Sequence, residues 1–313
     1  MRKSPGLGGT LRQMADEVRG QPAALRDFAA SDLPRAPKGS IFVGAGDSYA
    51  VALAAFHMSK GAMLAFDPYS LGTFPEIAAG RDVFFVSASG RTSSNIAAAR
   101  KVRGFAKETV AITADRNSGL AKATGSTIKL PMALAPRTPG LLSFTLSLVA
   151  ALRISIGDFS CDFGRAFGGA EKAGRNVSFA KGTTYFLGNS AAYGMAMYAQ
   201  SKTHEFLGAK AHAELLEEFS HLELFSLKRA DSVVALGCFD PSGTGPRLCR
   251  ALSRRGYEAR VIVPSETSDA EQLFQSVFAI QLAELREARS LGLDGPRFLS
   301  AKDSLEISDS MIY

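Results

Sequence analysis

Short apolar runs that end in glycine- or serine-rich loops alternate with helical patterns along most of this 313-residue chain. Two clear runs in the first half are Ile41–Val43 and Val83–Val86, and a stretch with helical periodicity follows each of them. Apolar runs of this length are typical of strands that are buried on both faces. Strands that alternate with helices at this spacing indicate βαβ units, which predict parallel sheets covered by helices on both faces.

This pattern occurs twice. The segment IFVGAGDSYAVALAA begins at Ile41 and YFLGNSAAYGMAMYA begins at Tyr185, so the order of strand, turn and helix recurs. The period is about 145 residues, and a glycine-rich segment over residues 158–182 separates the two copies. We therefore expect two α/β domains in tandem, over residues 36–160 and 161–313. A helical arm over residues 1–35 precedes them, as one amphipathic helix or as a pair of helices that is interrupted at Gly20–Pro22.

Charge and cysteine content narrow the class of protein. The net charge is +6, but the basic residues form no runs of five or more, so we expect no nucleic-acid partner and favour a small anionic substrate. The spacing of the three cysteines matches no zinc or redox motif, so we expect reduced thiols and no metal. The first residues lack a signal segment, and the most apolar stretch, residues 139–156, contains Arg153. These features predict a cytoplasmic protein without a membrane partner.

The loop SASGRTSS, residues 87–94, follows the Val83–Val86 strand directly and opens a helix. A loop in this position points free backbone N–H groups and the positive end of the helix dipole at one spot. Ser87, Ser89 and Thr92 add hydroxyl donors beside Ala88, and Gly90 allows the backbone to approach a ligand closely. The loop therefore predicts a phosphate site. The alternative is that Thr92 or Ser93 only caps the helix, although capping needs one hydroxyl and the loop has five.

A second candidate binding element is the turn after the Ile41–Val43 strand. Ligands in open α/β sheets bind beyond the carboxyl ends of the strands, so this turn is expected to lie next to the serine-rich loop. Gly46, Asp47 and Ser48 are its candidate sugar or phosphate contacts. The alternative for its glycines is an ordinary tight strand-to-helix turn.

Five segments in order along the chain resemble motifs of one family. They are MADEVRGQPAAL, VGAGDSYAVA, VSASGRTSSN, KTHEFLGAKAHAELLEEFSH and DGPRFLSAKDSLEI. They are similar to motifs of the sugar isomerase (SIS) domain family, in particular the isomerase half of glucosamine-6-phosphate synthase and its glutaminase-free relatives. The resemblance implies two tandem flavodoxin-like SIS domains, each a parallel sheet flanked by helices. It also implies an N-terminal helical arm and a catalytic C-terminal tail.

The resemblance also implies catalytic roles. Lys202 and Glu205 share one helix face, where the alternative is a surface ion pair. In the family pattern, Glu205 is the base that moves a proton between C1 and C2 of the sugar. His221 would open the sugar ring and would reach into the site of a partner subunit, which implies a homodimer with shared active sites. Lys302, otherwise an ordinary exposed lysine, would reach the carbonyl of the open-chain sugar.

Two departures from the family motifs leave more than one substrate compatible with the sequence. Asp47 stands where the family usually has threonine. The segment APRT, residues 135–138, resembles archaeal phosphoglucose/phosphomannose isomerases, so Arg137 could stabilise an enediolate and Thr138 could contact the substrate. The leading hypothesis is an isomerase or deaminase that interconverts fructose 6-phosphate and glucosamine 6-phosphate without a cofactor. The alternatives are a phosphoglucose/phosphomannose isomerase and a non-catalytic regulator that binds a phosphosugar.

Overall fold

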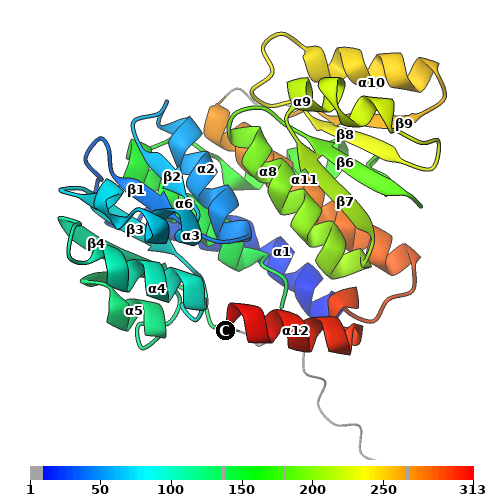
Figure 1. The fold of residues 1–313 in the computed structure, drawn as a ribbon. Helices are drawn as coiled ribbons and strands as arrows, with labels where there is room; N and C mark the ends of the chain where they lie inside the picture. The colour runs from blue at the N-terminus through cyan, green and yellow to red at the C-terminus, as the bar shows by residue number, and fades with distance from the viewer. Residues whose placement is uncertain (1–9, 135–137, 180, 265–267) are drawn as a thin grey trace, which may run out of the picture. The chain divides into compact units, whose positions relative to one another are not determined.

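The chain folds into an α/β structure with two parallel sheets, one of five strands and one of four, flanked by helices (Figure 1). The structure is a computed structural model, and it describes residues 10–134, 138–179, 181–264 and 268–313. Two compact units divide the chain. The five-stranded unit comprises residues 24–134, 142–159 and 306–313, and the four-stranded unit comprises residues 1–23, 135–141 and 160–305. Because the units interleave along the chain, the expected division at residues 35 and 160 stays a prediction.

The sheet of the five-stranded unit has the strand order β2-β1-β3-β4-β5, and all its pairs are parallel. This is the order of flavodoxin-like sheets. Its strands are β1 (Ile41–Val43), β2 (Leu64–Phe66), β3 (Asp82–Val86), β4 (Glu108–Thr113) and β5 (Ser126–Lys129). Its helices are α2 (Asp47–Met58), α3 (Pro68–Thr73), η1 (Pro75–Ala78), α4 (Ser93–Val102), α5 (Gly119–Ala123) and α6 (Leu142–Ile156).

Alternate residues of the central strands β1 and β3 face two different helical layers. Val43 and Phe85 are fully buried in one core cluster with residues of α3, α4 and α5. Phe42 and Phe84 lie between them in sequence, and their rings stack at 5.1 Å. Successive side chains of a strand point to opposite faces, so these two rings belong to the other face. Both faces of the sheet are therefore covered, as the apolar runs predicted.

The four-stranded unit repeats this arrangement with the strand order β7-β6-β8-β9, again entirely parallel. Its strands are β6 (Thr183–Leu187), β7 (Lys210–Glu214), β8 (Ser232–Leu236) and β9 (Glu258–Ile262). Its helical segments are α7 (Phe163–Ala173), α8 (Ala191–Lys202), η2 (Thr203–Leu207), α9 (Leu216–His221), η3 (Glu223–Phe225), α10 (Thr244–Arg254), α11 (Asp269–Ser290) and η4 (Arg297–Ser300). Two further helices, α1 (Leu11–Ala29) and α12 (Lys302–Ile312), each run from one unit into the other.

The N-terminal helix is continuous. α1 runs through Pro22, so the interruption that we considered at Gly20–Pro22 is absent from it. Buried Met14, Val18 and Leu25 lie on both sides of the proline and recur at intervals of four and seven residues. One continuous apolar face explains why the helix persists despite the backbone hydrogen bond that proline cannot make.

None of the described helices combines sufficient length with sufficient hydropathy to cross a membrane.

The three cysteines are expected to react slowly with thiol reagents. Burial raises the pKa of Cys161 to about 12 and the pKa of Cys238 and Cys249 to about 11. Because the thiolate is the reactive form, alkylation at about pH 8 should be about 10²-fold slower or more in the folded protein than in the unfolded chain. The measurement compares alkylation rates with and without guanidinium chloride. Equal rates in the two states would contradict the buried placement.

Candidate functional site

The serine-rich loop and the first turn lie side by side at one edge of the five-stranded sheet. β1 and β3 are hydrogen-bonded neighbours in parallel orientation, and Val43 pairs with Phe85. The turn over residues 44–48 and the loop over residues 87–92 therefore leave the sheet together. The structure thus brings Gly46, Asp47 and Ser48 beside the loop, as the order of the strands predicted.

The backbone of the loop is anchored through its carbonyl groups. The Ala88 carbonyl accepts a hydrogen bond of 2.9 Å from the Ala114 N–H, and the Gly90 carbonyl accepts one of 2.9 Å from the Leu120 N–H. Both donors belong to the segment that follows β4. These two hydrogen bonds fasten the loop backbone to that segment.

Gly90 is required by this conformation. Its φ angle is +61°, which side chains other than glycine rarely adopt. A Cβ atom at this position would lie 2.2 Å from the Ser118 Oγ and 2.8 Å from the Thr113 Oγ1. The loop therefore packs against the end of β4 and the start of α5 at a distance that only glycine allows.

Donor groups of the loop are left for a ligand. The N–H groups of Ala88, Ser89 and Thr92 donate to no other residue in the described parts of the chain. Thr92 is the N-cap of α4, but its side chain makes no capping hydrogen bond. Its hydroxyl lies 3.4 Å from the Ser87 Oγ instead. The capping alternative therefore does not account for the Thr92 hydroxyl, and the N-terminus of α4 adds a positive dipole at the same place.

Asn95 is a residue of this site that sequence reasoning did not single out. Its side chain is 1% exposed, and its Nδ2 donates 3.2 Å to the Val86 carbonyl at the end of β3. This bond ties the first turn of α4 to the strand that precedes the loop. An asparagine three residues after Thr92, inside an otherwise alanine-rich helix, was the only signal in the sequence.

The last two residues of the chain also contact this region of the five-stranded unit. The Ser93 Oγ donates 2.9 Å to the Ile312 carbonyl, and the Arg91 guanidinium lies 5.3 Å from the centre of the Tyr313 ring. The C-terminal residues therefore lie against the segment that follows Gly90.

The strand-to-helix turns of the two units share one geometry. The N-cap of α2 is Gly46, with φ 56° and ψ −126°, and the N-cap of α8 is Ser190, with φ 50° and ψ −129°. Gly44 and Gly188 precede them, and a Cβ atom at either would lie within 2.6 Å of helix backbone. The sequence repeat is therefore also a structural repeat, and the close approach explains both glycines.

Lys202 and Glu205 form an ion pair at the end of α8. The Lys202 Nζ lies 2.6 Å from the Glu205 Oε2, and the lysine side chain is 0% exposed while the glutamate is 31% exposed. The Ser201 Oγ donates 3.1 Å to the other carboxylate oxygen. A buried lysine excludes the surface ion pair that was the alternative for this motif. The partly exposed carboxylate remains accessible to a substrate.

Glu205 lies in a π-helical turn. The segment η2 continues α8 with a π-helix over Thr203–Leu207, and it ends at Gly208 with a left-handed φ of 62°. Single π-turns of this kind are rare and occur frequently at functional sites. Phe206 and Leu207 are buried in a cluster with α1 and α11, which leaves Glu205 on the outer side of the turn.

A chain of buried polar side chains supports this ion pair within the four-stranded unit. The Gln21 Nε2 donates 3.0 Å to Gln281, whose own Nε2 donates 2.9 Å to the Tyr198 hydroxyl. That hydroxyl donates 2.9 Å to the Gly140 carbonyl. The Lys202 ammonium lies 5.4 Å from the Tyr198 ring centre, where a cation–π contact stabilises it. Gln21 of α1 is thus connected to the Lys202–Glu205 pair through Gln281 and Tyr198.

The remaining candidate residues are placed as follows. Thr138 is half-buried, and Arg137 lies outside the described residues. His221 ends α9, its imidazole is 68% exposed, and its Nε2 lies 3.1 Å from the Glu217 carboxylate. Lys302 is the exposed first residue of α12, and its side chain bonds to none of the described residues. The catalytic roles expected for these side chains stay predictions.

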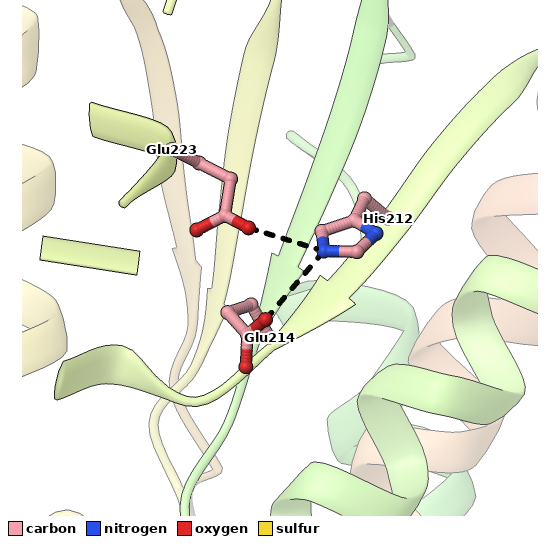
Figure 2. A group of neighbouring side chains, drawn as sticks. All are labelled: His212, Glu214 and Glu223. Atoms are coloured by element: carbon pink, nitrogen blue, oxygen red, sulfur yellow. Dashed lines mark ion pairs between the residues drawn. The ribbon is translucent and has the colours of Figure 1, made fainter. Parts of the chain in front are cut away.

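The helical pattern that precedes Gly208 in the sequence predicts a helix position for His212, but His212 lies on strand β7, so that prediction is wrong (Figure 2). The left-handed Gly208 ends the helix, and the alternation in KAHAE then buries the two alanines. The His212 Nε2 lies 3.5 Å from Glu214 and 3.3 Å from Glu223. These three residues are the ligand types of a metal site, and their ligand atoms lie within 4.8 Å of one another. The same distances also suit ion pairs between a protonated imidazole and the two carboxylates. The cluster by itself therefore does not identify a metal site.

Sequence comparison identifies one family. The SIS domain model matches residues 36–154, which hold the sheet of the five-stranded unit and both of the candidate binding loops. The resemblance to the SIS domain family is therefore confirmed. No curated protein sequence matches the chain.

Solved structures share the fold over nearly the whole chain. A glucosamine-6-phosphate deaminase from Thermotoga maritima has a TM-score of 0.73 at 19% identity, covering 91% of this chain and 97% of that one. The C-terminal domain of glucosamine-fructose-6-phosphate aminotransferase from Francisella tularensis has 0.72 at 16% identity, covering 90% and 97%. A tagatose-6-phosphate ketose/aldose isomerase from Escherichia coli has 0.69 at 17% identity, covering 90% and 94%.

Proposed function

Because the chain carries a SIS domain, we propose that it is an isomerase that interconverts the aldose and ketose forms of a hexose 6-phosphate. The observation that carries this proposal is the Lys202–Glu205 pair: a buried ammonium holds an accessible carboxylate on a π-helical turn. Proton transfer between neighbouring carbons needs one positioned base, and a carboxylate of this kind can act as that base. The fold shared with proteins that are named for such substrates adds support.

In this proposal the loop after β3 binds the 6-phosphate of the substrate. The free N–H groups of Ala88, Ser89 and Thr92, three hydroxyls and the N-terminus of α4 offer donors to the phosphate oxygens. The neighbouring turn supplies Gly46, Asp47 and Ser48 for sugar hydroxyls. A phosphate monoester carries nearly two negative charges and three acceptor oxygens, so it matches this set of donors.

Glu205 is the proposed general base. Its carboxylate removes the proton from C2 of the open-chain aldose and returns that proton to C1. With a hydroxyl group at C2 the intermediate is an enediolate and the product is the ketose. With an amino group at C2 the product is the C2 imine, which water hydrolyses to the ketose and ammonia. Lys202 and Ser201 hold the two carboxylate oxygens, so the base keeps one orientation during both transfers. Lys302 and Arg137 are proposed to stabilise the negative charge on the oxygens, and Thr138 to contact the sugar.

We propose an amino sugar as the substrate, so the reaction interconverts fructose 6-phosphate and glucosamine 6-phosphate with free ammonia. The motifs of α1 and of the tail, which are similar to those of glucosamine-6-phosphate synthase, favour this version. Product analysis on fructose 6-phosphate, glucose 6-phosphate and glucosamine 6-phosphate, with and without ammonium, tests it. We expect fructose 6-phosphate to be converted only when ammonium is present, and glucosamine 6-phosphate to be converted without added ammonium, with release of ammonia. Conversion of glucose 6-phosphate without ammonium would favour the phosphoglucose/phosphomannose isomerase, and binding without turnover would favour a regulator.

We also propose a homodimer in which His221 serves the site of the partner subunit and opens the sugar ring. Leu222 and Phe225 follow His221 and are 60% and 84% exposed. Exposed apolar side chains that gather into a patch mark surfaces that contact another protein, and these two side chains could contribute to such a patch. Two-fold dimers are the commonest oligomers, and their symmetry would give two equivalent sites.

Mixing two inactive variants is expected to restore activity. In a mixed dimer of His221→Ala and Glu205→Gln, one site collects both lesions and the other collects none. Random subunit exchange should therefore restore up to about one quarter of the sites. Activity is measured after mixing, while mass spectrometry follows the exchange. Proven exchange without any recovery would mean that His221 serves its own chain or has no catalytic part.

A further inference from the structure

Glu284 is a buried carboxyl group directly behind the proposed catalytic turn. It lies on α11, and its side chain is 0% exposed. Its Oε1 lies 2.5 Å from the Oγ1 of Thr203, which is the first residue of the π-helical turn η2. Both residues belong to the four-stranded unit.

The hydrogen bonds of Thr203 indicate which group carries the proton between the two side chains. Its hydroxyl has one hydrogen, and its Oγ1 lies 2.9 Å from the Ala199 carbonyl, which can only accept. With that hydrogen donated to Ala199, the hydrogen in the 2.5 Å contact must come from Glu284. A protonated carboxyl group satisfies both contacts at once, whereas a carboxylate would leave one of them without a hydrogen.

The surroundings of Glu284 also favour the neutral form. Its Oε2 is buried without a hydrogen-bond partner, and the carboxyl group forms no ion pair with any described residue. Burial raises its pKa to about 8. The charged groups that face it are Lys202, which opposes this rise, and Glu205 and Glu287, which add to it. An ionised carboxylate at full burial would need several donors, and Thr203 is the single one among the described residues.

We propose that Glu284 is a positioning residue, held as a neutral carboxylic acid that fastens the π-helical turn to α11 and leaves the charge of Lys202 to Glu205. The assignment rests on the proposed function of Glu205. Ionised Glu284 would compete with Glu205 for Lys202 and would repel the Glu205 carboxylate. As an acid it does neither, and its hydrogen bond to Thr203 fixes the start of the turn that carries the base.

The protonation state is tested first, by carbon-13 NMR of protein labelled at the glutamate carboxyl carbons. The Glu284 signal is identified as the one that disappears in Glu284→Gln. We expect this signal to keep the chemical shift of a neutral carboxyl group while the signals of the other glutamates show ionisation. It should change only near the Glu284 pKa of about 8. Titration near the ordinary glutamate value of 4.5 would overturn the proposal. This measurement needs no turnover, so it stands even if the isomerase proposal fails.

Two variants test the positioning role. Glu284→Leu fills the same space without a donor, and Glu284→Gln keeps a neutral donor for Thr203. A base displaced by about 1 Å costs up to about 10²-fold, so we expect Glu284→Leu to lower kcat at least about tenfold. We expect KM for the phosphosugar to change little and Glu284→Gln to restore most of the loss. Unchanged kcat in Glu284→Leu, or no rescue by glutamine, would overturn the role.

Thermal unfolding adds a readout that does not depend on activity. Between about pH 5 and 8, the unfolded chain releases the Glu284 proton and the folded protein keeps it, so wild-type stability should fall as pH rises. Glu284→Gln lacks this proton. The Tm of Glu284→Gln minus the Tm of wild type should therefore increase steadily over this pH interval and level off above the pKa of Glu284. A Tm difference that stays constant with pH would contradict a neutral Glu284.

Discussion

Replacing Glu205 by glutamine is expected to lower kcat for sugar-phosphate isomerisation by about 10²- to 10⁴-fold, the usual loss when a general base is removed. Glutamine keeps the shape of the side chain and can still accept a hydrogen bond from Ser201, so the fold should be retained. The loop after β3, which is proposed to bind the phosphate, is untouched. Steady-state kinetics should therefore show a large fall in kcat with little change in KM.

A matched control is the exposed Glu171 on α7, whose side chain forms no bond with any residue that the structure describes. Glu171→Gln makes the same chemical change and should leave kcat within about twofold of wild type, as surface substitutions usually do. If Glu205→Gln and Glu171→Gln had similar kcat values, Glu205 would not be the base. The Lys202–Glu205 pair would then have no central role in the proposed catalysis.

The second large effect is expected at Gly90. Alanine there would face a φ of +61° and a Ser118 oxygen 2.2 Å from its Cβ, so the loop must shift or strain. Backbone strain of this kind costs about 1–3 kcal/mol. If the loop relieves this strain by moving its N–H and hydroxyl donors, its affinity for phosphate should fall about tenfold or more. Calorimetry with inorganic phosphate and with fructose 6-phosphate measures both affinities.

Gly104→Ala is the matched control for Gly90→Ala. Gly104 is an exposed glycine of the same unit, and its φ is not in the left-handed region. A Cβ atom at Gly104 would have no described neighbour within 4 Å, so alanine fits there without strain. Its substitution should leave phosphate affinity unchanged. Equal affinities of the two variants, with Tm values that show both to be folded, would mean that the loop after β3 does not bind the phosphate.

Much of the fold could be predicted because its signals are local. The apolar runs at Ile41–Val43 and Val83–Val86 form strands, and both faces of their sheet are covered. The adjacency of the two candidate binding loops then followed from the parallel strand order alone. Strand β7 was missed because KAHAE is short, carries charge and directly follows a strong helical pattern. Its period-two alternation of alanine and polar residues was the signal, and Gly208 marked the end of the helix.

The support of the candidate site could not be predicted, because it depends on tertiary contacts. Glu284 sits in the segment AELREAR, which is typical of a solvated helix with ion pairs along one face. Only packing of α11 against α8 and η2 buries it and brings it to Thr203, which lies 81 residues earlier in the chain. The π-helical turn, which ends in the buried Phe206 and Leu207, likewise has no sequence signature.

The most direct test of the proposed isomerase is exchange of the C2 proton with solvent. Wild-type protein is incubated in deuterium oxide with glucosamine 6-phosphate, glucose 6-phosphate or fructose 6-phosphate, and NMR follows deuterium at C1 and C2. Proton transfer through Glu205 predicts incorporation with at least one of these sugars, and a loss of about 10² or more in the exchange rate for Glu205→Gln. No incorporation with any of them, or exchange at the wild-type rate in Glu205→Gln, would contradict the account.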